Sequence, residues 1–160
     1  MPLHIVLHEP LIPANTGNIA RSCAATGAHL HLIHPLGFST DDRYLKRAGL
    51  DYWHAVKVHH YDHFEHFAQV QKELLGERAG TFYFVETWGE KLYTEVAFRD
   101  GDYIILGKET TGLPQELTDR YKEQTIRIPM SGATRSVNLS NCAAIVLFEG
   151  LRQLGFPGLE

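Results

Sequence analysis

Two short, almost continuously apolar runs constrain the fold of this chain most strongly. Residues 81–85 (TFYFV) and residues 103–106 (YIIL) offer almost no polar side chain to water. Strands of this kind occur in parallel sheets whose two faces are both covered by helices. Parallel neighbours need a crossover segment, usually a helix, so the rest of the chain is expected to alternate strand and helix.

The remaining sequence supplies that alternation. Apolar alternation and β-branched residues predict further strands at 3–8, 30–33, 53–58 and 125–128. Helices are predicted at 15–25, 41–48, 62–75, 114–120 and 136–154, with Asn15 or Thr16 capping the first and Asp62 the third. We therefore expect an α/β fold with a largely parallel sheet, within one domain that spans residues 1–160.

Composition disfavours several classes of protein. The chain is 44% hydrophobic, and its longest apolar run, residues 143–148, is far shorter than the roughly 20 residues of a membrane span. The N-terminus lacks the basic and apolar pattern of a secretory signal. Cys23 and Cys142 lie far apart, so we expect two reduced thiols in a cytoplasmic protein without a membrane partner.

Charge is unevenly distributed along the chain. Residues 1–60 carry five basic and four acidic side chains, whereas residues 61–160 carry ten basic and fifteen acidic ones, which gives a net charge of −4. A nucleic acid would therefore have to bind a local patch, built from the N-terminal part or from two subunits.

Two stretches are too rich in turn and polar residues to serve only as connections. NTGNIAR (15–21) lies where a strand meets a helix; capping explains part of it, and Arg21 is expected to face a site at the edge of the sheet. The planar donor fork of arginine suits phosphate or ribose. LGKETTGLP (106–114) leaves a buried strand through two glycines, which permit close approach of a ligand to the backbone or an unusual φ.

A third stretch, IRIPMSGATRSVNLSN (126–141), is the densest. Ser136, Asn138, Ser140 and Asn141 are poor helix formers at the start of a predicted helix. Capping accounts for one or two of them, and the surplus indicates binding.

Other chemistries have little support in the sequence. LGKETTGLP has neither the GxGxxG nor the GxxxxGK[ST] spacing, which disfavours Rossmann dehydrogenases and P-loop enzymes, and no GxSxG is present. His59, His63 and His66 are spaced for one helix face and so for a metal, but they match no zinc motif. A solvated or packed helix face is the favoured interpretation, and no metal is expected.

Together the three stretches resemble the motifs of the SPOUT class of RNA methyltransferases: NTGNIAR resembles motif 1, LGKETTGLP motif 2 and IRIPMSGATRSVNLSNCAAIVLFE motif 3. The stretch IVLHEPLIPANTGNIARSCAATGAHLHLIHPLGF, the following RYLKRAGLDYW and the terminal EGLRQLGFPG narrow the resemblance to the TrmL/YibK family of tRNA wobble-nucleotide 2′-O-methyltransferases. VETWGEKLYTEVAF matches that family only loosely.

The resemblance implies a SPOUT-type parallel sheet flanked by helices, a deep trefoil knot in the C-terminal part, and a homodimer. It implies S-adenosylmethionine (AdoMet) as cofactor, S-adenosylhomocysteine (AdoHcy) as product, and transfer of a methyl group to the ribose of nucleotide 34, cytidine or uridine, in the tRNA anticodon loop. Matched by position, the implied cofactor contacts are Val85, Gly107, Ile128 and Ser136, several of them through backbone groups.

Arg21 is the implied catalytic residue of this reaction. A guanidinium stays protonated, so we expect Arg21 to orient the ribose and stabilise charge on its oxygen rather than to act as a base. Asn15, Ser136 and Asn138 are the expected partners that fix this geometry.

Four basic residues are expected to contact the RNA backbone: Arg43, Lys46 and Arg47, which share one face of the helix predicted at 41–48, and Arg135. Two alternatives remain open. The chain could methylate another tRNA site or ribosomal RNA, or it could be a non-catalytic RNA-binding module on the same fold.

Overall fold

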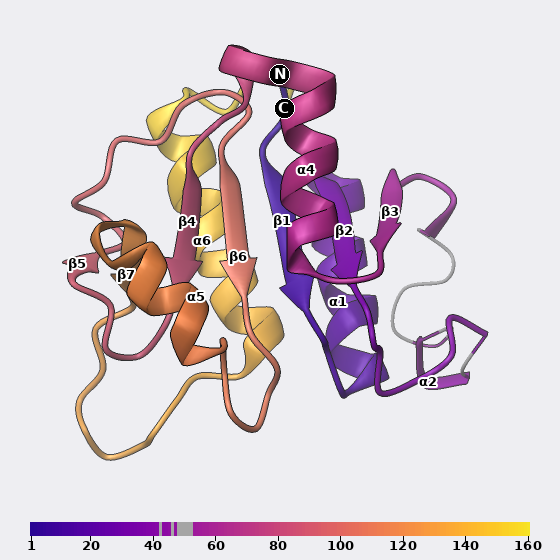
Figure 1. The fold of residues 1–160 in the computed structure, drawn as a ribbon, viewed down its shortest axis with the longest axis horizontal. Coiled ribbons are helices and arrows are strands. Elements are labelled where there is room, and N and C mark those ends of the chain that lie inside the picture. Colours follow the sequence, from indigo (N-terminus) through magenta and orange to yellow (C-terminus); the bar gives the residue numbers. More distant parts are fainter. Residues whose placement is uncertain (42, 46, 48–52) are drawn as a thin grey trace.

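A computed structural model describes residues 1–41, 43–45, 47 and 53–160 (Figure 1). The strands and helices alternate as expected, which confirms the α/β class. In chain order the elements are β1 (His4–His8), α1 (Pro13–Thr26), β2 (His29–Ile33), α2 (Arg43–Leu45), β3 (Val58–Tyr61), α4 (Phe64–Leu75), the 3-10 helix η2 (Gly76–Arg78), β4 (Phe82–Val85), β5 (Lys91–Leu92), β6 (Tyr103–Leu106), α5 (Gln115–Arg120), the 3-10 helix η3 (Lys122–Gln124), β7 (Thr125–Arg127) and α6 (Leu139–Gln153).

The seven strands form one sheet in the order β3-β2-β1-β6-β4-β7-β5, and each neighbouring pair is parallel. From β1 the chain winds outward through β2 to β3, and the later strands build the other half of the sheet beyond β6. The winding direction therefore changes between β1 and β6. Ligands of open α/β sheets bind beside the carboxyl ends of the strands near such a change.

Helices cover both faces of the sheet, with α1 and α6 behind it and α4 in front of it in Figure 1. The sequence of β6 is apolar throughout because all four of its residues are buried. Ile104 and Leu106 join the apolar cluster that contains α1 and α6, whereas Tyr103 and Ile105 join the cluster that contains α4 and α5.

β3 differs from the strand predicted at 53–58. The paired residues are Val58–Tyr61, and Trp53 lies outside the sheet. His59 stacks on His31 with 4.9 Å between the ring centroids, and Tyr61 is buried. The alternation of 53–58 has a different origin, because Trp53, Val56 and Val58 pack in the apolar cluster that contains α1 and α6.

The three histidines considered for one helix face belong to different elements. His59 lies on β3, His63 is the N-cap of α4, and His66 lies within α4. His63 Nδ1 accepts a hydrogen bond from the His66 backbone N–H (3.1 Å), and His66 Nδ1 accepts one from the Asp62 backbone N–H (3.0 Å). The cap predicted at Asp62 is therefore wrong, and His63 is the N-cap, while the His66 ring accepts from the backbone N–H of Asp62.

The starts of two further helices differ from the prediction. α1 begins at Pro13, and its N-cap Ile12 makes no side-chain hydrogen bond, so neither Asn15 nor Thr16 is the cap. Proline suits the first helical position because that position needs no backbone donor. α6 begins at Leu139 with Asn138 as its cap, three residues later than predicted.

The helix predicted at 41–48 is described only as α2, Arg43–Leu45. Arg43 and Arg47 are exposed, as RNA contacts would need to be, and Lys46 lies outside the described residues. Among the described helices, none is both long and apolar enough to cross a bilayer.

A buried polar network lies between the sheet and α4. The His4 Nδ1 and His31 Nε2 atoms are 2.9 Å apart, and His31 Nδ1 is 2.9 Å from the Tyr61 hydroxyl. Gln71 donates to the Tyr61 hydroxyl (3.0 Å) and accepts from the Tyr103 hydroxyl (2.7 Å). Burial lowers the pKa of His4 to about 4 and lowers the pKa of His31 well below its ordinary value.

We predict that the fold loses stability as the pH falls from 6.5 towards 4. Unfolded histidine has a pKa near 6.5, so the unfolded state binds protons in this range that the folded His4 and His31 resist. The stability that these two neutral histidines contribute is fully present above pH 6.5 and is lost progressively as the pH falls towards 4. The melting temperature, measured at half-unit pH steps, should therefore fall on acidification.

In His4→Phe, which keeps a ring to stack on Tyr103, this fall should be shallower even if the variant is less stable at pH 7. Replacing the exposed His54 by Gln should leave the slope as in the parent. A melting temperature that is constant between pH 7 and pH 4.5 would contradict the interpretation.

Candidate active site

A cavity of about 670 Å³ lies where strands β4, β6 and β7 end. Its walls come from the start of α1, from residues 85–88 after β4, from residues 106–112 after β6, and from residues 128–142, which lead into α6. The volume is within the range of small-molecule sites. The cavity therefore lies at the edge of the sheet where the topology favours a ligand.

The structure brings together most of the residues that the sequence singled out. All four implied cofactor positions line the cavity, namely Val85, Gly107, Ile128 and Ser136. Asn15, Asn138 and Arg135 line it as well.

Arg21 is not among the cavity's lining residues. It lies six residues after Asn15 on α1, on a different side of the helix, and its side chain is exposed. Within its own chain, Arg21 therefore does not reach this cavity. Arg43 and Arg47 also lie outside the lining.

Contacts within the loop after β6 are enough to require glycine at two of its positions, Gly107 and Gly112. A Cβ atom added at Gly107 would overlap the backbone of Gly112 and Leu113, so the loop closes tightly on itself. Gly112 has a φ of +72° and its N–H donates to the Lys108 carbonyl (2.9 Å). Of the two reasons that the sequence offered for these glycines, the unusual φ is confirmed at Gly112, and at Gly107 the close approach comes from the loop's own backbone.

Glu86 fastens this loop to β4. Its Oε1 atom accepts a hydrogen bond from the Leu113 N–H at 2.6 Å, and its carboxylate packs against Gly112. Burial raises the pKa of the Glu86 carboxyl, and hydrogen bonds from the backbone of Leu113 and Thr87 oppose that rise. Glu86 also lines the cavity, so one of the cavity walls carries a half-buried acid.

A second carboxylate, that of Glu109, joins the loop to α1. It accepts hydrogen bonds from the backbone N–H groups of Leu11 (2.9 Å) and Ile12 (2.8 Å) and from Asn15 Nδ2 (3.2 Å). The start of a helix presents unpaired N–H groups and a positive dipole end, which an anion stabilises. Glu109 therefore takes over the function that the sequence assigned to a cap within 15–21.

Asn15 continues this connection to α6. Its Oδ1 atom accepts from Asn138 Nδ2 at 3.2 Å, and Asn138 Oδ1 accepts from the backbone N–H groups of Ser140 (2.9 Å) and Asn141 (3.4 Å) and from the Ser140 hydroxyl (2.6 Å). Capping thus involves Asn138 and Ser140, whereas Ser136 and Arg135 line the cavity without capping α6.

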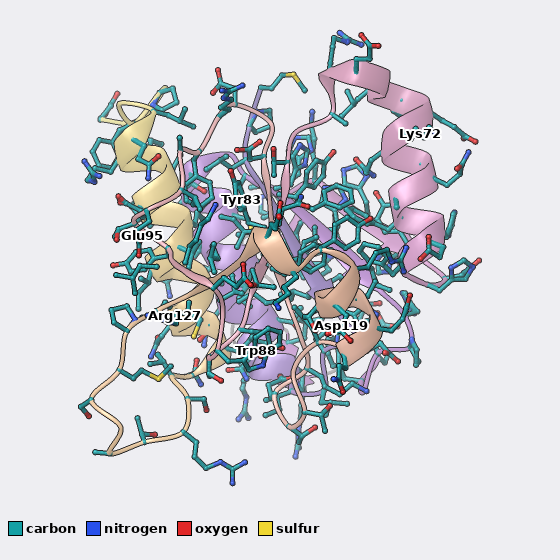
Figure 2. The ribbon with its side chains drawn as sticks, turned by 60° about the vertical axis from the view of Figure 1, so that its left-hand side comes forward. Lys72, Tyr83, Trp88, Glu95, Asp119 and Arg127 are labelled. Carbon is teal, nitrogen blue, oxygen red and sulfur yellow. The ribbon has the colours of Figure 1, made fainter. Side chains whose placement is uncertain are left out.

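Sequence reasoning missed Glu86, Trp88 and Glu109. Trp88 lines the cavity although its side chain is 53% exposed, and Figure 2 shows it at the lower end of the sheet, among the loops of the site. A signal was present for all three, because Glu86 and Trp88 lie within three residues of the apolar run 81–85 and Glu109 lies in the loop 106–114. Among the described residues, no group of three or more His, Cys, Asp or Glu side chains is arranged to hold a metal ion.

Known proteins resemble this chain over its length. The model of the SpoU rRNA methylase family matches residues 2–148. A protein of Escherichia coli K12 named tRNA (cytidine(34)-2'-O)-methyltransferase is 45% identical over 157 residues, which cover 98% of this chain and 96% of the relative.

Solved structures agree with that result. One, described as giving structural insights into the 2-OH methylation of C/U34 on tRNA, is 44% identical with a TM-score of 0.87 over 96% of both chains. An AdoMet-bound rRNA methyltransferase from Sinorhizobium meliloti is 25% identical with a TM-score of 0.82, over 96% of this chain and 57% of that protein. With the parallel sheet and the loops described above, these matches place the chain in the SpoU rRNA methylase family.

Proposed function

We propose that this protein is an AdoMet-dependent methyltransferase that modifies the ribose 2′-oxygen of nucleotide 34, cytidine or uridine, in the anticodon loop of tRNA. The observation that carries the proposal is the cavity, which gathers Val85, Gly107, Ile128 and Ser136 from separate loops. The name of the E. coli relative, whose length this chain nearly matches, favours tRNA over ribosomal RNA. A tRNA substrate also fits the cytoplasmic location expected from the sequence.

The cavity suits AdoMet in size and in chemistry. Val85, Leu106 and Ile128 give it apolar walls, Trp88 adds an exposed aromatic ring, and Glu86 adds a negative charge. Exposed backbone groups of the loops can pair with an adenine edge. When bound, AdoMet supplies a methyl group on a positively charged sulfur. The AdoMet-bound relative from S. meliloti supports this choice of cofactor.

The residues of the chain have separate tasks in this scheme. The Glu109, Asn15 and Asn138 hydrogen bonds hold the walls of the cavity in place before RNA arrives. The Arg21 guanidinium orients the ribose and stabilises the negative charge that grows on its 2′-oxygen, while the proton of that hydroxyl leaves to water. Arg135, at the cavity, and the exposed Arg43 and Arg47 contact the RNA backbone together with Lys46.

We further propose a homodimer in which Arg21 of one protomer serves the cavity of its partner. Arg21 is exposed on α1, and α6, which packs beside α1, exposes Ile145 (37%) and Phe148 (44%). An interface on this side of the sheet would bury these apolar side chains and bring Arg21 towards a second molecule.

We also infer that residues 1–160 form one domain with a deep trefoil knot. β7 lies between β4 and β5, so the C-terminal part of the chain enters the sheet inside the connection that runs from β4 through β5 to β6. This placement supports threading of the segment from β7 onwards.

The first prediction from the proposed function concerns the cofactor. Gly107→Val should abolish AdoMet binding measured by calorimetry without RNA, because the added side chain forces the loop apart at Gly112 and Leu113. The exposed Ala55→Val should bind like the parent. Undiminished affinity in a folded Gly107→Val protein, or parental activity that a chelator removes, would disprove the assignment.

The second prediction concerns Arg21. Arg21→Ala should lower the single-turnover rate at saturating tRNA by about 10²–10³, the usual loss for one oxyanion donor. AdoMet affinity should barely change, and Arg21→Lys should restore little because an ammonium lacks the planar fork. Arg47→Ala should instead weaken tRNA binding in a salt-dependent manner. A parental rate in Arg21→Ala, or a defect confined to AdoMet binding, would exclude the role.

The third prediction tests the shared site. Arg21→Ala and Gly107→Val proteins should each be nearly inactive, but after denaturation and refolding together they should regain about a quarter of the parental activity. Half of such dimers are mixed, and each mixed dimer contains one complete site. If Arg21 served its own chain, the mixture would stay inactive, because no chain would then have both parts.

A further inference from the structure

Two acidic side chains line the cavity, Glu86 and Glu109. Glu109 accepts three hydrogen bonds from the start of α1, whereas among the described residues Glu86 accepts fewer and has no charged partner. The Glu86 carboxylate is half-buried and lines the cavity, and its Oε1 atom accepts from the Leu113 N–H at 2.6 Å. In the described part of the chain, no Lys, Arg or His side chain comes within ion-pair distance, 4.0 Å, of this carboxylate.

The two basic residues of the same cavity do not neutralise Glu86. Lys108 Nζ lies 3.9 Å from Glu9 Oε2, on the side of β1, and Arg135 makes no ion pair with a described residue. Burial raises the pKa of the Glu86 carboxyl, because a buried carboxylate without a nearby positive charge is costly to ionise. A cation in the cavity would relieve that cost.

We propose that Glu86 recognises the charge of the cofactor and makes this enzyme bind AdoMet more tightly than AdoHcy. The inference rests on the function proposed above and concerns how the same cavity distinguishes substrate from product. AdoMet carries a positive sulfonium and loses this charge when its methyl group leaves. A carboxylate in the cavity wall therefore attracts the sulfonium of AdoMet, the substrate, but does not attract the neutral sulfur of AdoHcy, the product.

Glu86 also lies in a stretch that the family resemblance does not explain well. Glu86 belongs to VETWGEKLYTEVAF, the stretch that matches the TrmL/YibK pattern only loosely. The hydrogen bond to Leu113 gives Glu86 a structural task as well, so a test has to separate its charge from its ability to accept a hydrogen bond.

Glu86→Gln makes that separation. The amide keeps an Oε1 acceptor for the Leu113 N–H and nearly the same volume, and it removes the negative charge. Glu90→Gln is the matched control, since Glu90 is exposed, lies outside the cavity lining and pairs with Lys122 at 3.7 Å. Calorimetry of the full chain without RNA would give the affinities for AdoMet, for AdoHcy and for sinefungin, which carries an amine in place of the methylated sulfur.

In Glu86→Gln the affinity for AdoMet and sinefungin should fall about tenfold relative to that for AdoHcy, because one opposite charge at 4–6 Å shifts an equilibrium by one to three powers of ten. Glu90→Gln should keep the parental ratios. An unfolded Glu86→Gln protein, seen as a lost melting transition, would instead show that Glu86 serves the loop and would overturn the proposal.

Equal losses for all three ligands, or no loss, in a folded Glu86→Gln protein would also refute the role of charge and leave the methyltransferase assignment intact. A parent protein that binds neither AdoMet nor AdoHcy would overturn the proposed function and this inference together.

Discussion

The hydrogen bonds that converge on Glu109 and pass through Asn15 to Asn138 hold the site together. They connect the start of α1, the loop after β6 and the start of α6. Asn15 lies 94 residues before Glu109 and 123 residues before Asn138 in the sequence. The sheet brings the strand ends to one edge, but loops that leave neighbouring strands have no reason to stay close. One carboxylate and two amides supply that reason here, with each amide using both its donor and its acceptor.

The interior of the fold could be predicted because burial on both faces leaves a clear trace in sequence. The apolar runs of β4 and β6 predicted their positions almost to the residue, and the predicted ends of α1 and α4 lie within one residue of the observed ends, Thr26 and Leu75. β3 was misplaced because the apolar residues Trp53 and Val56 pack in the core from outside the sheet, and alternation alone does not distinguish such packing from strand pairing. The start of α1 was misplaced for a different reason, since Glu109 is distant in sequence.

The site could be predicted in part, and the division has a physical basis. Val85, Gly107, Ile128 and Ser136 were found through a resemblance and lie together in the cavity. The reason for Gly107 was not visible in the sequence, because the atoms that exclude a side chain there belong to its own loop. The location of Arg21 shows a further limit: a motif gives the identity of a residue, whereas the fold decides whether its side chain faces the cavity, and that of Arg21 does not.

The closed loop after β6 also has a thermodynamic consequence. The Gly112 N–H donates a hydrogen bond to the Lys108 carbonyl, and the Leu113 N–H donates one to the Glu86 carboxylate. Neither hydrogen bond needs a bound ligand. The conformational entropy of residues 107–113 is therefore lost when the chain folds and not when a small molecule binds. Binding to such a pre-ordered wall leaves most of the interaction energy available as affinity, and its heat-capacity change reflects burial of the ligand's apolar surface rather than ordering of the protein.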